Sequence, residues 1–405
     1  MIVWARDRVP GKHRQRRIIF IGGTSEPGGL HVHTAEVAQA CAALGCRVSV
    51  LCPSINHFEG LITDPTVRVE AISPLHQMSW GRWIATSRPI GARSSRPDVV
   101  FCRGSFAETP LSELTMAACV GRRIYTIDHR PWEGPWDARI SKRLYGTLSA
   151  ALSRRSIVVS EEIADSAAGE FGFPRNKIAT CLNWVHPQFH APADEERRAA
   201  RAEFGPDQTT LLVGYVGRLA PEKRVDALLH AFASVANEYE GQVALALAGD
   251  GWKRQTLEAL TRDLGIANNV MFLGWQKAPW RFLAACDLCV LPSLVEGFPL
   301  ALMEAMATGR PCLAHPMSST RRLIENETMG MLADLAKPEV FASALGDLLR
   351  LSGEARLRIG RAAALRIASE FSRERRLRDV LQALDLTPTH LPKVAPRLLG
   401  FASVA

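Results

Sequence analysis

The sequence lacks a long apolar run. None of its stretches approaches the ~20 consecutive apolar residues that a membrane-spanning helix needs. The basic start, MIVWARDRVPGKHRQRR, is not followed by the apolar segment of a secretory signal. We therefore expect residues 1–17 to be either a disordered basic tail or an over-extended start of the chain. Both absences argue against a spanning or secreted protein.

The cysteines lack a repeating spacing. The chain has nine of them, an odd number, which does not suit a disulfide framework and predicts reduced thiols in the cytoplasm. Cys286 and Cys289 have the spacing of a metal-binding pair, but the sequence has no second pair to complete a zinc site. Both lie in an apolar strand-like run, so we interpret them as core residues and predict no bound metal.

A dinucleotide-binding loop is missing too. The first glycine-rich loop reads GGTSEPGG, which is not G-x-G-x-x-G. The strand after it ends in Cys52 and Pro53, without an acidic residue to bind a ribose. These features disfavour an oxidoreductase that uses a dinucleotide.

Apolar strand-like runs alternate with helical runs along the chain. RIIFIGG, RVSVLCP, DVVFCRG and SIVVSEE are strand-like in the first half, and TTLLVGYVGRL, VALALAGDG, VMFLGW and DLCVLPSL in the second. This alternation predicts α/β domains in which helices cover both faces of a parallel sheet. The pattern restarts after a charged, alanine-rich stretch, and 405 residues exceed one ordinary core. Two α/β domains are therefore predicted.

We place the N-terminal domain at residues 18–190, a linker at 191–208 and the C-terminal domain at 209–371. Residues 372–405 are expected to form a last helix, over 372–386, and a Pro-rich irregular tail.

Positive charge is concentrated in the first half of the chain. The net charge is +8, and much of the excess falls in residues 76–155, where basic side chains alternate with tryptophans. This basic segment includes Trp80, Arg82, Trp83, Arg88, Arg93, Arg96, Trp132, Trp136, Arg139, Lys142 and Arg143. Such a surface suits an anionic partner, which could be a lipid leaflet, an acidic or phosphorylated substrate, or nucleic acid. The alternative is a solvated basic face.

The stretch EGFPLALMEAMATG, residues 296–309, follows the strand-like DLCVLPSL. Pro299 fits the first turn of a helix, and Gly309 fits its C-terminal cap. Loops at the carboxyl ends of parallel strands are where open α/β sheets bind ligands. A helix N-terminus beside a glycine such as Gly297 offers free N–H groups to a phosphate. The sequence therefore predicts a ligand site at this loop.

Two glutamates interrupt this apolar stretch. A carboxylate is costly to bury unless it accepts hydrogen bonds. Glu304 lies about 7.5 Å beyond Pro299 at ~1.5 Å per residue, an offset that suits the two hydroxyls of a ribose. Glu296 would accept hydrogen bonds from a sugar beside the phosphate. The alternative for Glu304 is a salt bridge to a neighbouring helix.

A second loop in the same predicted sheet carries two cations. In GYVGRLAPEKRVDALLHAF, a strand and the Gly217 turn are followed by Arg218 and Lys223. Two cations on one loop suit the two phosphates of a nucleotide diphosphate and would stabilise the charge that it gains as a leaving group. The alternative is a pair of solvated surface cations.

These motifs resemble a known family. VGRLAPEKRVDALLHAF, LALAGDGWKRQTLEAL, VMFLGW and VLPSLVEGFPLALMEAMATGRP look like the C-terminal half of family-4 glycosyltransferases. ALGCRVSVLCP, DVVFCRG and IVVSEEIADSAAGEFGFPRNKIATCLNWV are similar to their N-terminal half. The resemblance covers roughly residues 18–385. It implies the GT-B fold, in which two Rossmann-like domains face one cleft and the last helix returns to the first domain.

The resemblance also implies an activity. Members are retaining enzymes that move a sugar from a nucleotide-diphosphate sugar to an acceptor. We expect a glycan or lipid-linked acceptor, in cell-surface polysaccharide or lipopolysaccharide biosynthesis. The family generally needs no metal cofactor, which agrees with the absence of an Asp-x-Asp pair in a plausible site. The expected location is cytoplasmic, with peripheral contact to an anionic membrane and no nucleic-acid partner.

Applied residue by residue, the resemblance assigns roles. Arg218 and Lys223 become the diphosphate clamp, Glu304 the ribose ligand and Glu296 the contact to the donor sugar. His129 would lie near the reacting sugar, which makes it catalytic together with Glu296, Arg218 and Lys223. The expected donor-binding set is completed by Gly28, Gly29, Gly297, Phe298, Pro299 and Leu300.

The chain departs from the family pattern at three places. Arg224 stands where the family often has glycine, and NWVH (residues 183–186) where it often has Asn-Gly-Val-Asp. The order Asp128 then His129 leaves open which of the two faces the site. A different class of function also stays open, namely a non-catalytic module that binds nucleotide sugars or anionic glycans.

Overall fold

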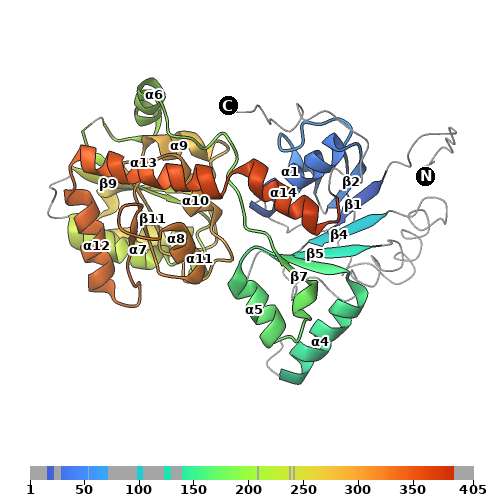
Figure 1. Ribbon diagram of the computed structural model, residues 1–405. Coiled ribbons are helices and arrows are strands. Elements are labelled where there is room, and N and C mark those ends of the chain that lie inside the picture. The colour runs from blue at the N-terminus through green and yellow to red at the C-terminus, as the bar shows by residue number, and fades with distance from the viewer. Residues whose placement is uncertain are drawn as a thin grey trace. The chain divides into compact units, whose positions relative to one another are not determined.

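The computed structural model describes residues 16–21, 29–52, 54–71, 98–103, 123–128, 139–207, 209–236, 239 and 242–386. The chain forms two compact units. The first comprises residues 1–182 and 374–405, and the second comprises residues 183–373. Figure 1 labels their helices and strands.

The first unit is built on a parallel sheet. In the described residues its strand order is β3-β2-β1-β4-β5-β6-β7. The strands are β1 (Arg17–Ile21), β2 (Arg47–Cys52), β3 (Arg68–Ala71), β4 (Val99–Arg103), β5 (Ile124–Asp128), β6 (Arg155–Val158) and β7 (Ile178–Thr180). The described helices before residue 183 are α1 (Gly29–Ala43), α4 (Arg139–Leu152) and α5 (Glu161–Gly169), with 3-10 turns at Ile55–Phe58 and Arg175–Lys177.

The last helix, α14 (Arg373–Ala383), belongs with the first unit. Asp385, just beyond it, accepts hydrogen bonds from the Tyr125 hydroxyl (3.0 Å) on β5 and from Arg154 Nε (2.7 Å) beside β6. The Arg16 guanidinium donates to the Asp385 carbonyl oxygen at 2.9 Å. These contacts attach the end of α14 to the sheet, so the predicted return of the last helix is confirmed.

The second unit repeats the plan. Its described strands are parallel, in the order β10-β9-β8-β11-β12-β13. They are β8 (Leu211–Val216), β9 (Val243–Ala248), β10 (Val270–Gly274), β11 (Leu288–Leu291), β12 (Cys312–Ala314) and β13 (Met331–Leu332). The helices are α6 (Asp194–Phe204), α7 (Val225–Ala236), α8 (Arg254–Asp263), α9 (Pro279–Ala285), α10 (Leu300–Ala307), α11 (Ser318–Leu323), α12 (Pro338–Arg350) and α13 (Gly353–Glu370).

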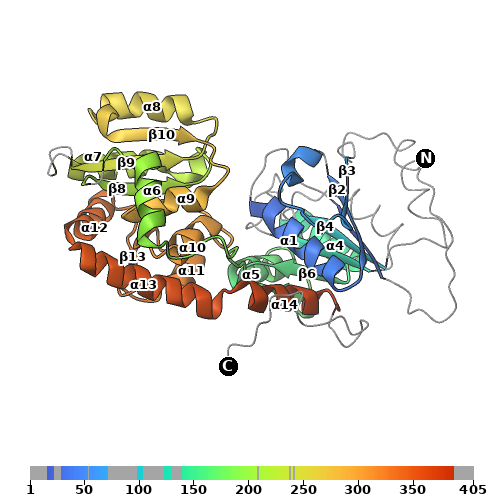
Figure 2. The same cartoon turned by 90° about the horizontal axis from the view of Figure 1, so that it is seen from above.

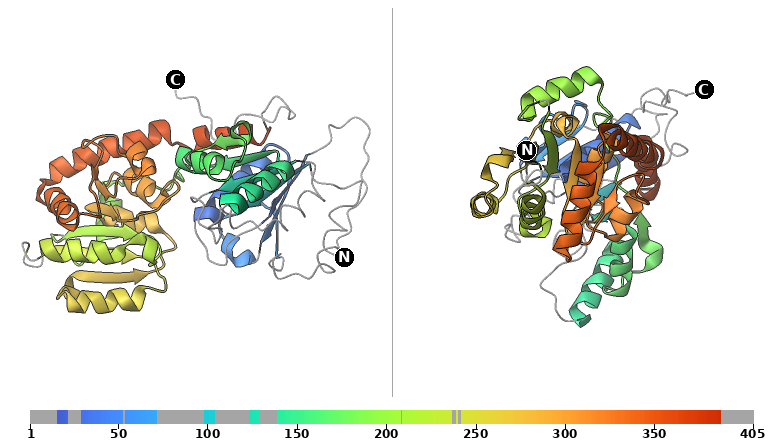
Figure 3. Two further views of the ribbon diagram at one scale, coloured as in Figure 1. Left: turned by 90° about the horizontal axis from the view of Figure 1, so that it is seen from below. Right: turned by 90° about the vertical axis from the view of Figure 1, so that its left-hand side faces the viewer.

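Helices cover both faces of the second sheet, as Figures 2 and 3 show. Helix α7 packs between α12 and α8, whereas α9 contacts α6 and α10, and α10 contacts α13. Two α/β units with parallel sheets match the predicted fold class. Among the strands on which that prediction rests, β9 and β11 are buried along their whole length, whereas β10 is mostly half-buried.

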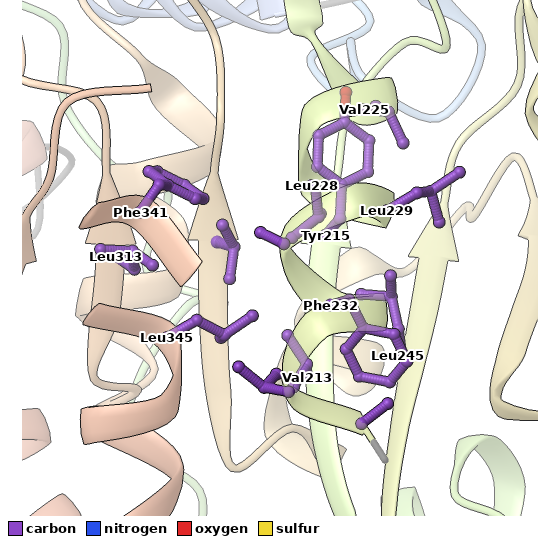
Figure 4. Close-up of a cluster of buried hydrophobic side chains, with 14 of the residues drawn as sticks. Val213, Tyr215, Val225, Leu228, Leu229, Phe232, Leu245, Leu313, Phe341 and Leu345 are labelled. Atoms are coloured by element: carbon purple, nitrogen blue, oxygen red, sulfur yellow. The ribbon is translucent and has the colours of Figure 1, made fainter. Parts of the chain in front are cut away.

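The core on the α7 side explains why this helix forms where it does. Apolar residues recur at helical spacing along α7 and pack on β8, β9 and α12 (Figure 4). Phe232 of α7 is fully buried, as are Tyr215 of β8 and Phe341 of α12. Burial of such large side chains gives most of the stability of a core.

The predicted linker, residues 191–208, does not separate the units. The division falls between Leu182 and Asn183, and residues 194–204 form helix α6 of the second unit. Arg197 and Arg201 of α6 donate to the two carboxylate oxygens of Asp287 at 2.7 and 3.1 Å. The charge of these arginines was part of the reason for predicting a linker. In the structure they attach α6 to the rest of the second unit.

Cys286 and Cys289 are buried core residues, as predicted. A Cβ atom added to Gly214 would lie 2.4 Å from Cys286 Sγ, so the glycine lets β8 pass close to the thiols. In the described part of the chain, no group of acidic, His and Cys side chains could hold a metal ion. No helix there is long and apolar enough to span a membrane.

The strand order reverses between β8 and β11. Strands β9 and β10 follow β8 on one side, and the chain then crosses to β11 on the other. Open α/β sheets bind ligands at the carboxyl ends of the strands at such a reversal. The two loops that leave β8 and β11 are therefore the expected site of the second unit.

Candidate functional site

Two loops flank the reversal. The clamp loop, residues 217–224, leads from β8 to α7, and the carboxylate loop, residues 292–299, leads from β11 to α10. The clamp loop holds Arg218 and Lys223, and the carboxylate loop holds Glu296. The structure thus places the predicted cations and this carboxylate on loops that leave two adjacent parallel strands.

The clamp loop has a fixed backbone. Gly217 N donates to the carbonyl oxygen of Ala248 at 3.1 Å, and Leu219 N donates to that of Asp250 at 2.9 Å. A Cβ atom on Gly249 would lie 1.8 Å from the Gly217 oxygen, so this close approach requires glycine. The buried Tyr215 hydroxyl donates to the Arg218 carbonyl oxygen at 2.7 Å. The loop is held before any ligand arrives.

Each predicted clamp cation has a carboxylate partner. Lys223 forms an ion pair with Glu296, and both side chains are mostly buried, with 17% and 15% of their surface exposed. Arg218 Nη2 donates to Glu222 Oε1 at 2.8 Å within the clamp loop. Burial raises the pKa of Tyr215, and the nearby charges of Glu296 and Glu222 raise it further. The hydroxyl of Tyr215 therefore stays protonated and keeps its bond to the loop.

The carboxylate loop is held from both sides. Leu294 N donates to the Glu222 carbonyl oxygen at 3.2 Å, which joins the two loops. At the other end, Asn183 Nδ2 donates to the Phe298 carbonyl oxygen at 2.9 Å. The Phe298 ring packs against Phe371, with centroids 5.6 Å apart. The bond from Asn183 uses one of the two acceptor positions of the Phe298 carbonyl oxygen, and the predicted contact to a phosphate would come from N–H groups of this loop.

Glu304 has a different environment from Glu296. Helix α10 begins at Leu300, directly after Pro299, and Gly309 adopts a left-handed φ of +69° just beyond its end. Among the described residues the Glu304 carboxylate has no hydrogen-bond or ion-pair partner, so they do not supply the salt bridge that was the alternative. Burial raises the pKa of Glu304 to about 8. A partly buried carboxyl without a protein partner is the feature expected of a ligand contact.

Arg224 closes the clamp loop in a left-handed conformation, with φ of +49°. This backbone region is unfavourable for residues with a Cβ atom, which agrees with the glycine that the family often has here. Both Asp226 carboxylate oxygens accept from Arg224 Nε at 3.2 Å. The side chain thus pairs with a carboxylate in the first turn of α7 rather than joining Lys223.

The first unit was predicted to contribute Gly28, Gly29 and His129 to the site. Gly28 and His129 lie outside the described residues, and Gly29 begins α1 without described surroundings. Asp128 is the last residue of β5. Sequence reasoning missed two residues that organise the site, Glu222 and Asn183. The signals were present, since Glu222 adjoins the clamp lysine and Asn183 opens the NWVH stretch.

Comparison with known proteins supports this reading. The model of glycosyl transferases group 1 matches residues 196–366, and that of Glycosyltransferase Family 4 matches residues 27–189. The chain belongs to the family-4 glycosyltransferases of the GT-B fold. It is 25% identical over 329 residues to an uncharacterized glycosyltransferase of Methanocaldococcus jannaschii, covering 78% of this chain and 83% of that one.

Other relatives match over shorter spans. A lipopolysaccharide 1,6-galactosyltransferase of Salmonella typhimurium is 36% identical over 148 residues, which is 35% of this chain and 39% of the relative. With the D-inositol 3-phosphate glycosyltransferase of Rhodococcus jostii the match spans 58% of the relative's length. The fold is shared with an Anabaena protein solved with UDP and glucose, with a TM-score of 0.78 and 18% identity over 92% of this chain and 100% of the other. The chain is a glycosyltransferase by family and fold.

Proposed function

We propose that this glycosyltransferase moves a hexosyl group from a nucleotide-diphosphate sugar to a glycan or lipid-linked acceptor, with retention of the anomeric configuration. The observation that carries the proposal is the pairing of a clamp-loop lysine with a carboxylate-loop glutamate at the strand reversal. Two cations, Arg218 and Lys223, converge there with their carboxylate partners Glu222 and Glu296, and Glu304 lies on the helix that follows without a partner among the described residues. This set suits a diphosphate flanked by two sugars.

Each of these residues would bind a different part of the donor. Arg218 and Lys223 would hold the diphosphate and stabilise the negative charge that develops as its bond to the sugar breaks. Glu296, already beside Lys223, would accept hydrogen bonds from the transferred sugar. Glu304 would accept the ribose hydroxyls, which offsets the cost of burying its charge. None of these steps requires a metal ion, and His129 remains a candidate for contact with the reacting sugar.

The donor's arrival would change the pairing of Lys223. The ammonium pairs with Glu296, so a diphosphate that binds Lys223 must share or replace that carboxylate. Sharing would leave Glu296 between the lysine and the sugar, where it can bind both. The ion pair therefore keeps both side chains in place until the donor binds.

The acceptor is proposed from the relatives. The galactosyltransferase of Salmonella is named for lipopolysaccharide, so cell-surface polysaccharide or lipopolysaccharide biosynthesis is the proposed context. A lipid-linked acceptor agrees with a peripheral location at an anionic membrane. Most of the basic segment, residues 76–155, lies outside the described residues, although Arg139, Lys142 and Arg143 are on helix α4.

A donor panel tests the proposal. The purified chain should release nucleoside diphosphate from one class among UDP-, GDP- and ADP-sugars, with or without EDTA. Proton NMR of the transferred product should show the anomeric configuration of the donor. If the protein binds a nucleotide sugar but releases no diphosphate with any acceptor, the non-catalytic binding module becomes the better description.

A further inference from the structure

A cavity of about 180 Å³ opens at the amino edge of the second sheet. Helix α6, the start of β8 and the residue before β11 form its wall. The clamp and carboxylate loops leave the opposite ends of the same two strands, and β8 spans six residues, so roughly 20 Å separate the two edges. This amino-edge cavity is lined by Arg197, Arg198, Arg201, Thr209, Thr210, Leu211 and Asp287. None of these residues belongs to the site described above.

One carboxylate fixes two arginines of the amino-edge cavity. Asp287 Oδ1 accepts from Arg197 at 2.7 Å, and Asp287 Oδ2 accepts from Arg201 at 3.1 Å and from Leu212 N at 2.8 Å. The side chain of Arg201 is 5% exposed, and its guanidinium also donates to the Thr210 carbonyl oxygen. These bonds hold the two guanidinium groups in place, so a ligand would not have to order them.

The cavity also has hydrogen-bond donors that the described residues do not use. Arg197 donates from Nη1 to the Cys286 carbonyl oxygen and from Nη2 to Asp287, which leaves its Nε–H without an acceptor there. Arg198 is exposed on α6 and has no carboxylate partner among the described residues. Its guanidinium therefore brings a full positive charge and all of its N–H groups to the cavity wall.

The charge of the amino-edge cavity is positive. Three guanidinium groups line it, against the single carboxylate of Asp287. Asp207 lies beside the lining, where the hydroxyl and backbone N–H groups of Thr210 and Thr209 lower its pKa and keep it ionised. The acidic first turn of α6, residues 194–196, does not line the cavity. Even with Asp207 counted, the cations outnumber the carboxylates, so the cavity attracts anions.

We propose that the amino-edge cavity binds a small phosphate-bearing anion, either free phosphate or a phosphomonoester. Guanidinium groups match the oxygen geometry of phosphate and bind it through paired N–H groups. The volume equals that of about six water molecules at ~30 Å³ each, and it is below the 300–1,000 Å³ typical of sites for drug-sized ligands. That size favours a phosphate or a small ester over a nucleotide sugar. The ligand would be a second one, at the edge opposite the proposed donor site.

Equilibrium dialysis with radiolabelled orthophosphate, at constant ionic strength, tests the proposal. The measurement starts from an Arg218→Gln/Lys223→Gln clamp variant, so that phosphate bound at the clamp loop does not contribute. This variant should bind one phosphate per chain. Adding Arg198→Gln should weaken binding about fivefold or more, because one charge-assisted contact is lost. Arg361→Gln on α13 is the matched control, since Arg361 is also exposed and has no ion-pair partner among the described residues.

A hexose monophosphate added as competitor identifies the source of the phosphate group. Displacement at a lower concentration than unlabelled orthophosphate requires would identify an ester as the ligand, and displacement only at a higher concentration would identify free phosphate. If the clamp variant fails to fold, the same comparison of Arg198→Gln with Arg361→Gln is made in the wild-type chain.

Three results would overturn the anion site. The folded clamp variant could bind no phosphate, which would assign all binding to the clamp loop. Arg198→Gln could bind phosphate as tightly as its parent, or Arg361→Gln could weaken binding by the same factor, which would make the effect one of overall charge. Because the test measures no sugar transfer, its outcome is independent of the proposed function.

Discussion

The amide of Leu294 donates a hydrogen bond of 3.2 Å to the carbonyl oxygen of Glu222. The carboxylate of the same Glu222 accepts a bond of 2.8 Å from Arg218. One residue thus contacts both loops of the site, the carboxylate loop through its backbone and the clamp arginine through its side chain. It lies next to Lys223, which pairs with Glu296. Glu222 therefore couples the positions of all the charged groups expected to meet the diphosphate.

We predict that Glu222→Gln lowers turnover by about tenfold. The backbone bond to Leu294 survives, but Arg218 loses the ionic partner that orients it. A misdirected preorganised charge costs transition-state stabilisation, and complete removal of such a group costs on the order of 10²-fold or more. Single-turnover diphosphate release measures the effect, while the affinity for the nucleotide should change less.

The chain offers a matched control in Glu258→Gln. Glu258 pairs with Arg254 at 2.8 Å, and the two residues are four positions apart, as Arg218 and Glu222 are. The exposed fractions also match: 33% and 36% for Arg254 and Glu258, and 35% and 36% for Arg218 and Glu222. Exposed pairs of this kind contribute about 0.3–0.5 kcal/mol to stability. Both variants should therefore unfold alike, and equal turnover in both would remove the positioning role of Glu222.

The ion pair of Lys223 and Glu296 predicts a non-additive double variant. Lys223→Ala alone leaves a mostly buried carboxylate without its partner, and Glu296→Gln alone does the same to the ammonium. The loss of one partner from a buried pair is more destabilising than the loss of both. In denaturant unfolding, the double variant should be more stable than the sum of the single effects by about 1 kcal/mol or more. Simple additivity would show that the pair is not formed in solution.

Turnover should not recover in that double variant. We expect Lys223→Ala and Arg218→Ala each to lower the rate on the order of 10²-fold or more, the scale for one preorganised charge. Glu296→Gln should mainly lower turnover, because its proposed contact is to the reacting sugar. Near-normal turnover in an Arg218/Lys223 double alanine variant would exclude the clamp role.

The fold could be predicted from the sequence because the central strands are buried on both faces. Runs such as VALALA contain only apolar residues, so β9 and β11 were predictable from apolar content. The division between the units was not predictable from composition. In the sequence, the arginines of α6 resemble those of a solvated linker. Their bonds to Asp287 connect residues about ninety positions apart, and local composition does not reveal such contacts.

The same contrast holds within the site. Arg218, Lys223 and Glu296 stood out because charged residues on strand-to-helix loops match a ligand chemistry. Their mutual pairing did not stand out, since it depends on which loops the sheet brings together. Asn183 is a further case, because its bond to the Phe298 carbonyl joins positions 115 residues apart. The charged groups could be predicted from the local sequence pattern. Their partners could not, because these depend on contacts between residues far apart in the sequence.

Arg224 gives a prediction about stability. Its φ of +49° is unfavourable for any residue with a Cβ atom, by roughly 1–2 kcal/mol. Arg224→Gly and Arg224→Ala both remove the bonds to Asp226, but only glycine also relieves the backbone. The larger entropy that glycine loses on folding offsets part of this relief. The free energy of unfolding of the glycine variant should therefore exceed that of the alanine variant by about 0.5–1 kcal/mol. Urea denaturation of the two variants checks this, and a more stable alanine variant would contradict the left-handed backbone.

Glu304 gives a prediction about pH. Burial raises the pKa of its carboxyl in the folded chain from 4.5 to about 8, so the folded state holds this proton more tightly than the unfolded state does. The stability that this adds is fully present below pH 4.5 and is lost as the pH rises towards 8. Glu304→Gln imitates the protonated carboxyl and cannot titrate. The free energy of unfolding of the wild type should therefore fall below that of the variant across this window.

Nucleotide binding should respond to the same proton in the opposite sense. Ribose hydroxyls donate best to the ionised carboxylate, so a bound nucleotide should lower the pKa of Glu304. The affinity of the wild type should then rise with pH up to about 8 and level off above it. The Glu304→Gln variant should bind the nucleotide more weakly, and its affinity should lack this rise. The phosphates of the nucleotide titrate in the same way with both proteins, so the difference between the two pH profiles reports Glu304 alone. Calorimetric titrations of both proteins from pH 6 to 9 measure the difference, and parallel pH profiles would show that Glu304 does not contact the nucleotide.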